Sequence, residues 1–258
     1  MELPYFETVS KLWNPLIVAL LMPLSATLRT DNWTTACKWD SVIPFEPMWE
    51  QLKRIIKPNG AILLNASQPF TSALIMSNPD MFRYEIIWQK ERPTNFMMWN
   101  KQILKYHENI CVFYKEQPTY NPILEEKPPE NKRKNKPRKM TNAVYWITEW
   151  EKYEERTAVW WMKDFNYPHS IQFFSMERGL HPTQKPVALI EYLIKTYSLE
   201  GDIILDFTSG SWTTWIAAQN TNRQFILIEK DKNYYDISLK RLQENKERLD
   251  KLSKKDIM

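Results

Sequence analysis

Glycine and cysteine are both scarce in this sequence. It holds 4 glycines in 258 residues, where average usage of about 7% would give roughly 18, so few backbone positions can depend on glycine's freedom at positive φ. Two cysteines, Cys37 and Cys111, are too few for a disulfide framework or a four-cysteine zinc site, and they favour a reducing cytoplasm. The longest apolar run, residues 16–24, is far shorter than the ~20 residues that span a bilayer. We therefore expect a buried core segment there, with no membrane span, signal peptide or metal site.

The positive charge is concentrated in one stretch of the chain. The formal net charge is +4, but the run "KPPENKRKNKPRK" at 127–139 has seven basic residues and one acid, which leaves the remainder at −2. A patch of this density suits a polyanion such as nucleic acid. A solvated loop without a partner is the alternative interpretation.

Hydrophobic periodicity predicts an α/β chain. Residues 45–60 have a helical pattern, with Met48, Leu52, Ile55 and Ile56 on one face, and Pro58-Asn59-Gly60 is expected to end that helix. Short β-rich runs occupy 61–65, 84–88, 110–114, 202–207 and 224–229. Further helical patterns occupy 186–198, 213–220 and 232–252. Such alternation argues for one domain, residues 1–258, with a largely parallel sheet covered on both faces.

Two acids end consecutive predicted strands near the C-terminus. Asp206 ends the first, Gly210-Ser211 lies in the turn to the next helix, and Glu229 ends the second strand. This is the position at which α/β sheets bind cofactors, and a carboxylate at the second strand can accept hydrogen bonds from ribose hydroxyls. Acids also end strands in many α/β proteins that bind no nucleotide.

The most specific string is "GLHPTQKPVALIEYLI" at 179–194. With "TDNWTT" upstream and "LDFTSGS" and "FILIE" downstream, it resembles S-adenosylmethionine-dependent DNA amino-methyltransferases of phage or restriction-modification type. The match is to the class whose catalytic motif precedes the cofactor motif, and it covers residues 30–243. The resemblance implies a Rossmann-like methyltransferase fold with a mixed, mostly parallel sheet and helices on both faces.

The resemblance also implies an activity and a set of site residues. The activity is transfer of a methyl group from S-adenosylmethionine to the exocyclic amine of adenine or cytosine in double-stranded DNA, by an enzyme that is often a homodimer. By position in the family motifs, the catalytic residues are Asp31, Asn32 and Trp33. The cofactor-binding residues are Asp206, Phe207, Gly210, Ser211, Thr213, Glu229, His181, Thr183, Gln184 and Lys185.

Residues 119–167 fall where the family inserts its target-recognition region. The DNA-binding residues expected in it are Lys132, Arg133, Lys134, Lys136, Arg138 and Lys139. These basic side chains suit phosphates, and the region's many aromatic rings suit stacking on bases. A small aromatic core is the alternative role for those rings.

Two loops depart from the family pattern. The family's D-P-P-Y and G-T-T strings are replaced by "TDNWTT", shorter by two residues if Asp31 is the acid. Aligning Trp33 with the family's tyrosine would instead place Thr30 at the acidic position. In the cofactor motif, Trp212 and Trp215 stand at positions that are glycine or small. An indole in a turn that must approach the ligand closely predicts weak or lost binding of S-adenosylmethionine. Two hypotheses follow: a methyltransferase with impaired activity, or a non-catalytic nucleic-acid-binding protein with the same fold. A methyltransferase of protein glutamine or RNA would have the reverse order of motifs.

Overall fold

The computed structural model describes residues 17–23, 43–127, 165–177, 184–210 and 213–229, with Lys232, Tyr235, Asp236 and Lys240. The contacts between residues divide the chain into two compact units. One comprises residues 1–121 and 170–258, and the other comprises residues 122–169. In the second unit, β5 (Glu125–Glu126) pairs with β6 (Phe165–Asn166) in an antiparallel sheet. The expected inserted region, 119–167, lies mostly outside the described residues and stays a prediction.

A seven-stranded sheet forms the centre of the first unit. Its strands are β1 (Ile17–Pro23), β2 (Ile56–Ala66), β3 (Phe82–Gln89), β4 (His107–Phe113), β7 (Ile171–Phe173), β8 (Ile203–Asp206) and β9 (Gln224–Leu227). The order across the sheet is β7-β3-β4-β2-β1-β8-β9. Only β4 pairs antiparallel with its neighbours, β2 and β3, and the other pairs are parallel. The mixed, mostly parallel sheet predicted from the sequence is confirmed.

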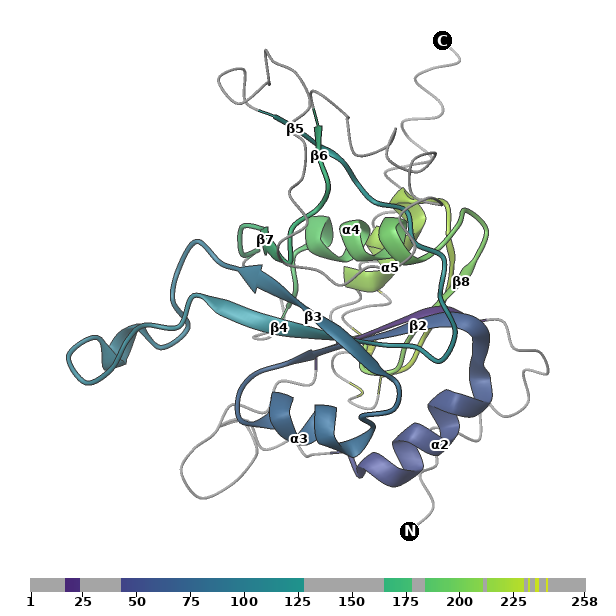
Figure 1. Cartoon of the computed structure of the whole chain (residues 1–258), viewed down its shortest axis with the longest axis horizontal. Helices are drawn as coiled ribbons and strands as arrows, with labels where there is room; N and C mark the ends of the chain where they lie inside the picture. The colour runs from purple at the N-terminus through teal and green to yellow at the C-terminus, as the bar shows by residue number, and fades with distance from the viewer. Residues whose placement is uncertain are drawn as a thin grey trace, which may run out of the picture. The chain divides into compact units, whose positions relative to one another are not determined.

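Helices cover both faces of this sheet (Figure 1). The helices α2 (Phe45–Ile55) and α3 (Phe70–Ser77) lie on one side, and α4 (Val187–Tyr197) and α5 (Thr213–Asn220) on the other. A short 3-10 helix, η1 (Phe96–Met98), lies between β3 and β4. Because successive strand residues point to opposite faces, β2 alternates between two cores: Ile62 and Leu64 pack under α2 and α3, Ala61 and Leu63 under α4 and α5.

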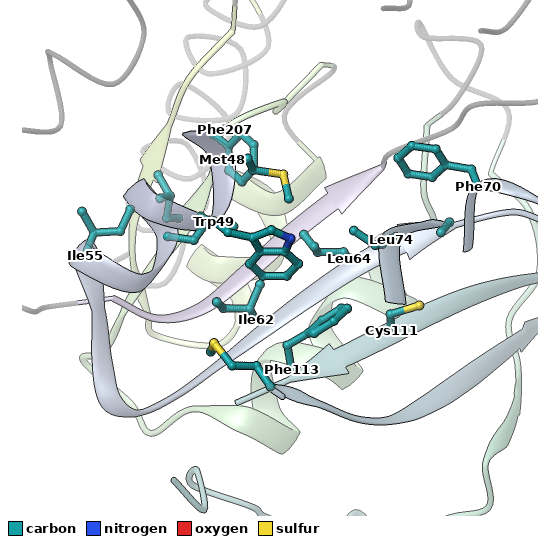
Figure 2. Packing of buried hydrophobic residues seen from close by; sticks show 14 residues of the cluster. Met48, Trp49, Ile55, Ile62, Leu64, Phe70, Leu74, Cys111, Phe113 and Phe207 are labelled. Carbon is teal, nitrogen blue, oxygen red and sulfur yellow. The ribbon is translucent and has the colours of Figure 1, made fainter. Parts of the chain in front are cut away.

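The first core is organised around an aromatic pair. Figure 2 shows Trp49 of α2 over the sheet, among Met48, Ile62 and Phe113. The Trp49 and Phe113 ring centroids are 4.9 Å apart, and the indole N–H donates to Ser77 Oγ at 2.7 Å. This hydrogen bond satisfies the one polar atom that the buried indole brings with it.

One sequence expectation needs correction. The helix at 45–60 ends at Ile55, because Ile56 pairs with Ile17 of β1 and residues 56–60 already belong to β2. Pairing with a neighbouring strand therefore overrides the local turn signal at Pro58. In the apolar segment at 16–24, for which the sequence predicted no element type, residues 17–23 form the strand β1 between β2 and β8. No helix in the described part of the chain has the length and apolar character needed to cross a membrane.

Candidate functional site

The turn after β8 is built around a buried carboxylate. Asp206 is 3% exposed; it accepts a hydrogen bond from the Thr208 backbone N–H at 3.0 Å and another from Thr214 Oγ1, in α5, at 2.5 Å. Burial raises the pKa of Asp206 to about 7, against these two hydrogen bonds, and the charge of Glu229 adds to the rise. Asp206 therefore ties the strand, the turn and the start of α5 together.

Backbone contacts bind the same turn to the end of β9. The Gly210 N–H donates to Glu229 Oε2 at 2.7 Å, the Ser209 N–H donates to the Ile228 carbonyl at 3.1 Å, and the Ile228 N–H donates to the Asp206 carbonyl at 2.9 Å. Gly210 has φ +50°, in the left-handed region that favours glycine. The sequence-predicted residues Asp206, Gly210 and Glu229 are thus brought together at the carboxyl ends of two parallel strands.

The hydroxyls of Thr208 and Thr213 make no hydrogen bond within the described part of the structure, although both oxygens are buried. Phe207, also expected to bind the cofactor, is 9% exposed and packs in the first core. A buried hydroxyl without a partner is unfavourable by about 1 to 3 kcal/mol. Both threonines flank the Gly210 turn in sequence, so this part of the protein has polar atoms that a bound molecule could satisfy.

Lys185 belongs to a second buried cluster on β3 and β4. Its Nζ lies 3.1 Å from Glu108 Oε2, and Lys90 Nζ is paired with Glu108 Oε1. Both ammonium groups lie over the Trp88 ring, Lys90 at 4.6 Å and Lys185 at 5.8 Å from its centroid. The ion pair between Lys185 and Glu108 therefore holds the residue just before α4 against the sheet. Gln184, which precedes Lys185, is half-buried.

Glu108 is the site-region residue that sequence reasoning missed. Burial alone would raise the pKa of its carboxyl, but the Lys185 and Lys90 ammonium groups bring it down to about 2. Burial lowers the pKa of Lys90, and Glu108 only partly opposes this. The pKa of each group is therefore lowered, that of Glu108 by the two neighbouring cations and that of Lys90 by burial. The only sequence signal was an acid two residues before the apolar run at 110–113 of β4.

Trp215 occupies a core position. Its side chain is 2% exposed and meets the Phe225 ring edge-on, with centroids 6.4 Å apart. Phe225 lies four residues before Glu229, towards the start of β9. The indole of Trp215 is therefore accommodated by packing, and the steric argument against cofactor binding now depends on Trp212.

Several predicted site residues lie outside the described part of the chain. They are Asp31, Asn32, Trp33, His181, Thr183, Ser211 and Trp212, together with the basic residues Lys132, Arg133, Lys134, Lys136, Arg138 and Lys139. In the sequence, Asp31 comes after β1, which ends at Pro23 and lies between β2 and β8 in the sheet. In the described residues, no group of three or more His, Cys, Asp or Glu side chains could hold a metal ion.

Comparison with known proteins assigns the family. A family described as DNA methylase (N6_N4_Mtase) matches residues 4–240. The chain belongs to this DNA methylase family. Its relatives include the Type II methyltransferase M2.DpnII of Streptococcus pneumoniae, 46% identical over 69 residues, which are 27% of this chain and 26% of that protein. M.HpaI of Haemophilus parainfluenzae is 27% identical over 206 residues, 79% of this chain and 60% of that protein.

Solved structures agree with this family assignment at the level of fold. The M1.HpyAVI-SAM complex has a TM-score of 0.57 at 22% identity and covers 93% of this chain and 98% of its own. The cytosine-N4-specific PvuII DNA methyltransferase has a TM-score of 0.58 at 13% identity, with 91% and 82% covered. These likenesses show the Rossmann-like methyltransferase fold. The aligned stretches span less than two thirds of the relatives M2.DpnII and M.HpaI.

Proposed function

We propose that this DNA methylase family member transfers a methyl group from S-adenosylmethionine to the exocyclic amine of adenine or cytosine in double-stranded DNA. The observation that supports this most directly is the turn between β8 and α5, in which the Gly210 N–H donates to Glu229 Oε2, just beyond β9, at 2.7 Å. A carboxylate at the end of the second strand can accept hydrogen bonds from ribose hydroxyls, at the place where α/β sheets bind nucleotide-like cofactors.

The residues present fit this cofactor. Glu229 would accept hydrogen bonds from the ribose hydroxyls, and the buried hydroxyls of Thr208 and Thr213 would find partners in the bound molecule. Asp206 acts as a positioning residue, since its oxygens hold Thr208 and Thr214. S-adenosylmethionine supplies an electrophilic methyl group when bound. Lys185 is paired with Glu108. We propose that it lies beside the cofactor together with His181, Thr183 and Gln184, which precede it in the sequence.

On the DNA side, we propose that Asp31 accepts a hydrogen bond from the exocyclic amine of a base that has left the stack, with Asn32 and Trp33 in the same loop. Proton acceptance and orientation of the amine direct its lone pair to the methyl group. The basic residues from Lys132 to Lys139 would hold phosphates. The family resemblance further supports a homodimer, which sedimentation would test. The small number of cysteines supports a location in the cytoplasm, which cell fractionation would test.

We propose that Trp212 weakens cofactor binding. Overfilling a packed site is unfavourable by about 1 to 3 kcal/mol, which is about one to two decades of affinity. The alternative function, nucleic-acid binding without catalysis, rests on the same residue together with the altered loop at Asp31.

Calorimetric titration with S-adenosylmethionine tests both. We expect weak binding by the unmodified chain and about 10- to 100-fold tighter binding by Trp212→Gly. Trp99→Ala, which removes an indole that is 73% exposed, is the matched control and should leave the affinity unchanged. Micromolar affinity in the unmodified chain would contradict the obstruction by Trp212. Absence of binding in Trp212→Gly, with DNA binding intact, would establish the non-catalytic alternative.

A further inference from the structure

The chain between β3 and β4 forms an arm, residues 90–106, that projects from the sheet (Figure 1, the blue-green loop at the left). Hydrogen bonds give it a defined shape. The Lys90 N–H donates to the Tyr106 carbonyl at 2.7 Å, and the Thr94 N–H donates to the Lys105 carbonyl at 3.0 Å. Asn95 Oδ1 accepts the Lys105 N–H at 2.6 Å. The arm is therefore a built projection rather than an irregular connection.

This arm exposes large apolar side chains. Trp99 is 73% exposed and Ile103 94%, and Phe96 and Met97 are exposed as well. Phe96 and Trp99 lie three residues apart on η1 and its C-cap, where the Trp99 N–H points to the Phe96 carbonyl at 3.3 Å. Residues at this spacing share one side of a 3-10 helix. Exposing two aromatic rings to water on this ordered arm is unfavourable for a free monomer. We therefore expect the two rings to belong to a contact surface.

The charge of the arm indicates which partner fits. Without Lys90, which is buried and paired with Glu108, the arm contains three basic residues and one acid, a net charge of +2. Arg92 and Lys101 are exposed, and neither has a salt bridge with a residue in the described ranges. Exposed cations beside aromatic rings complement DNA, because the cations contact phosphates while the rings stack on bases or enter a base step.

The root of the arm lies at the edge of the sheet that carries the candidate site. β3 runs in the same direction as β2 and β8, because both β3 and β2 are antiparallel to β4 and β2, β1 and β8 are mutually parallel. The arm therefore leaves β3 at the edge where β8 ends in Asp206. An enzyme acting on an amine inside a duplex must unstack the base, and an apolar wedge stabilises the opened duplex.

We propose that the arm is a second DNA-contacting element, in which Phe96 and Trp99 wedge into the duplex while Arg92 and Lys101 hold phosphates. The role rests on the proposed function, because it supposes that the chain binds duplex DNA. It is independent of the basic run at 127–139. A surface for a second copy of this chain is the competing use of the same exposed rings.

The test measures the affinity of the full chain for a fluorescein-labelled 30-base-pair duplex at several salt concentrations. A second duplex with one unpaired adenine opposite an abasic site mimics the opened state. We expect Phe96→Ala/Trp99→Ala to weaken binding to the paired duplex by about tenfold or more, and binding to the opened duplex by less. Arg92→Ala/Lys101→Ala should lower the salt slope by about 2, since each lost phosphate contact lowers it by about 0.9.

Matched controls use exposed residues on the helices α2 and α3. Met76→Ala, at an apolar side chain 71% exposed on α3, and Lys53→Ala, at an exposed cation on α2, should change neither affinity nor slope. Unchanged DNA binding in both arm variants overturns the proposal even if the unmodified chain binds DNA well. Loss of a dimer in Phe96→Ala/Trp99→Ala by sedimentation, with DNA affinity unchanged, assigns the rings to a second copy instead. Failure of the unmodified chain to bind duplex at low salt overturns the proposed function along with the arm.

Discussion

Replacing Glu108 by Gln should destabilise the protein strongly, because it leaves two buried ammonium groups without their carboxylate. The Lys90 and Lys185 side chains are 3% and 6% exposed, and that of Glu108 is 16% exposed. Its pKa is lowered from the ordinary 4.5 to about 2. A difference of about 2.5 units corresponds to about 3 kcal/mol of folding free energy at neutral pH. Removing one partner of a buried ion pair typically has an effect of about 3 to 5 kcal/mol, which agrees.

The pH dependence gives the test its direction. Since the folded pKa of Glu108 lies below its unfolded value, the stabilisation is complete above pH 4.5 and is lost as the pH falls towards 2. At pH 3 about two fifths of it should remain.

Urea unfolding of the unmodified chain and of Glu108→Gln, followed by circular dichroism between pH 8 and pH 3, measures this difference. Glu116→Gln, at an exposed acid just beyond β4, makes the same change of charge and is the control. We expect a difference of about 3 kcal/mol at pH 7 that shrinks on acidification, against less than about 0.5 kcal/mol for the control. A loss no larger than the control's, or one that grows as the pH falls, would refute the role of this ion cluster.

Three further predictions concern residues that, apart from Trp215, lie outside the described ranges. Asp31→Ala should abolish transfer of tritium from labelled S-adenosylmethionine to DNA while DNA binding stays nearly intact; full activity would sink the assignment of the catalytic loop. The salt slope of DNA binding should flatten when alanine replaces Lys132, Arg133, Lys134 and Lys136, and an unchanged slope would identify a solvated loop. Finally, the chain has 12 Trp against 4 Gly, with Trp212 and Trp215 at small-residue positions of the family. This pattern is expected if UGA codons that specify glycine in the source cell are read as tryptophan in the sequence. Under that hypothesis, peptide mass spectrometry of the protein from its source cell should find glycine at positions 212 and 215. Tryptophan at these positions would contradict it.

Local patterns were sufficient for most of the helices and strands. The two periodicities, 3.6 in α4 and α5 and short apolar runs in β3, β4, β8 and β9, act over a few residues and are visible without a partner. The acids that follow the apolar runs of β8 and β9 were visible for the same reason. Because parallel strands end at one edge of a sheet, these acids were expected to lie close together. Motif order supplied the family resemblance that the comparisons confirm.

What the sequence by itself determined, then, is the element type, the fold class and the residues of the turn at Asp206 and Glu229. The tertiary structure alone decided the position of β1 between β2 and β8, the reversed direction of β4, and the early start of β2 at Ile56. It also decided that Lys185 is held by Glu108 and that Trp215 is buried against Phe225. The physical reason is the same in each case: these features depend on pairing and desolvation between segments distant in the chain, and no local pattern records which distant charge or strand a residue will meet.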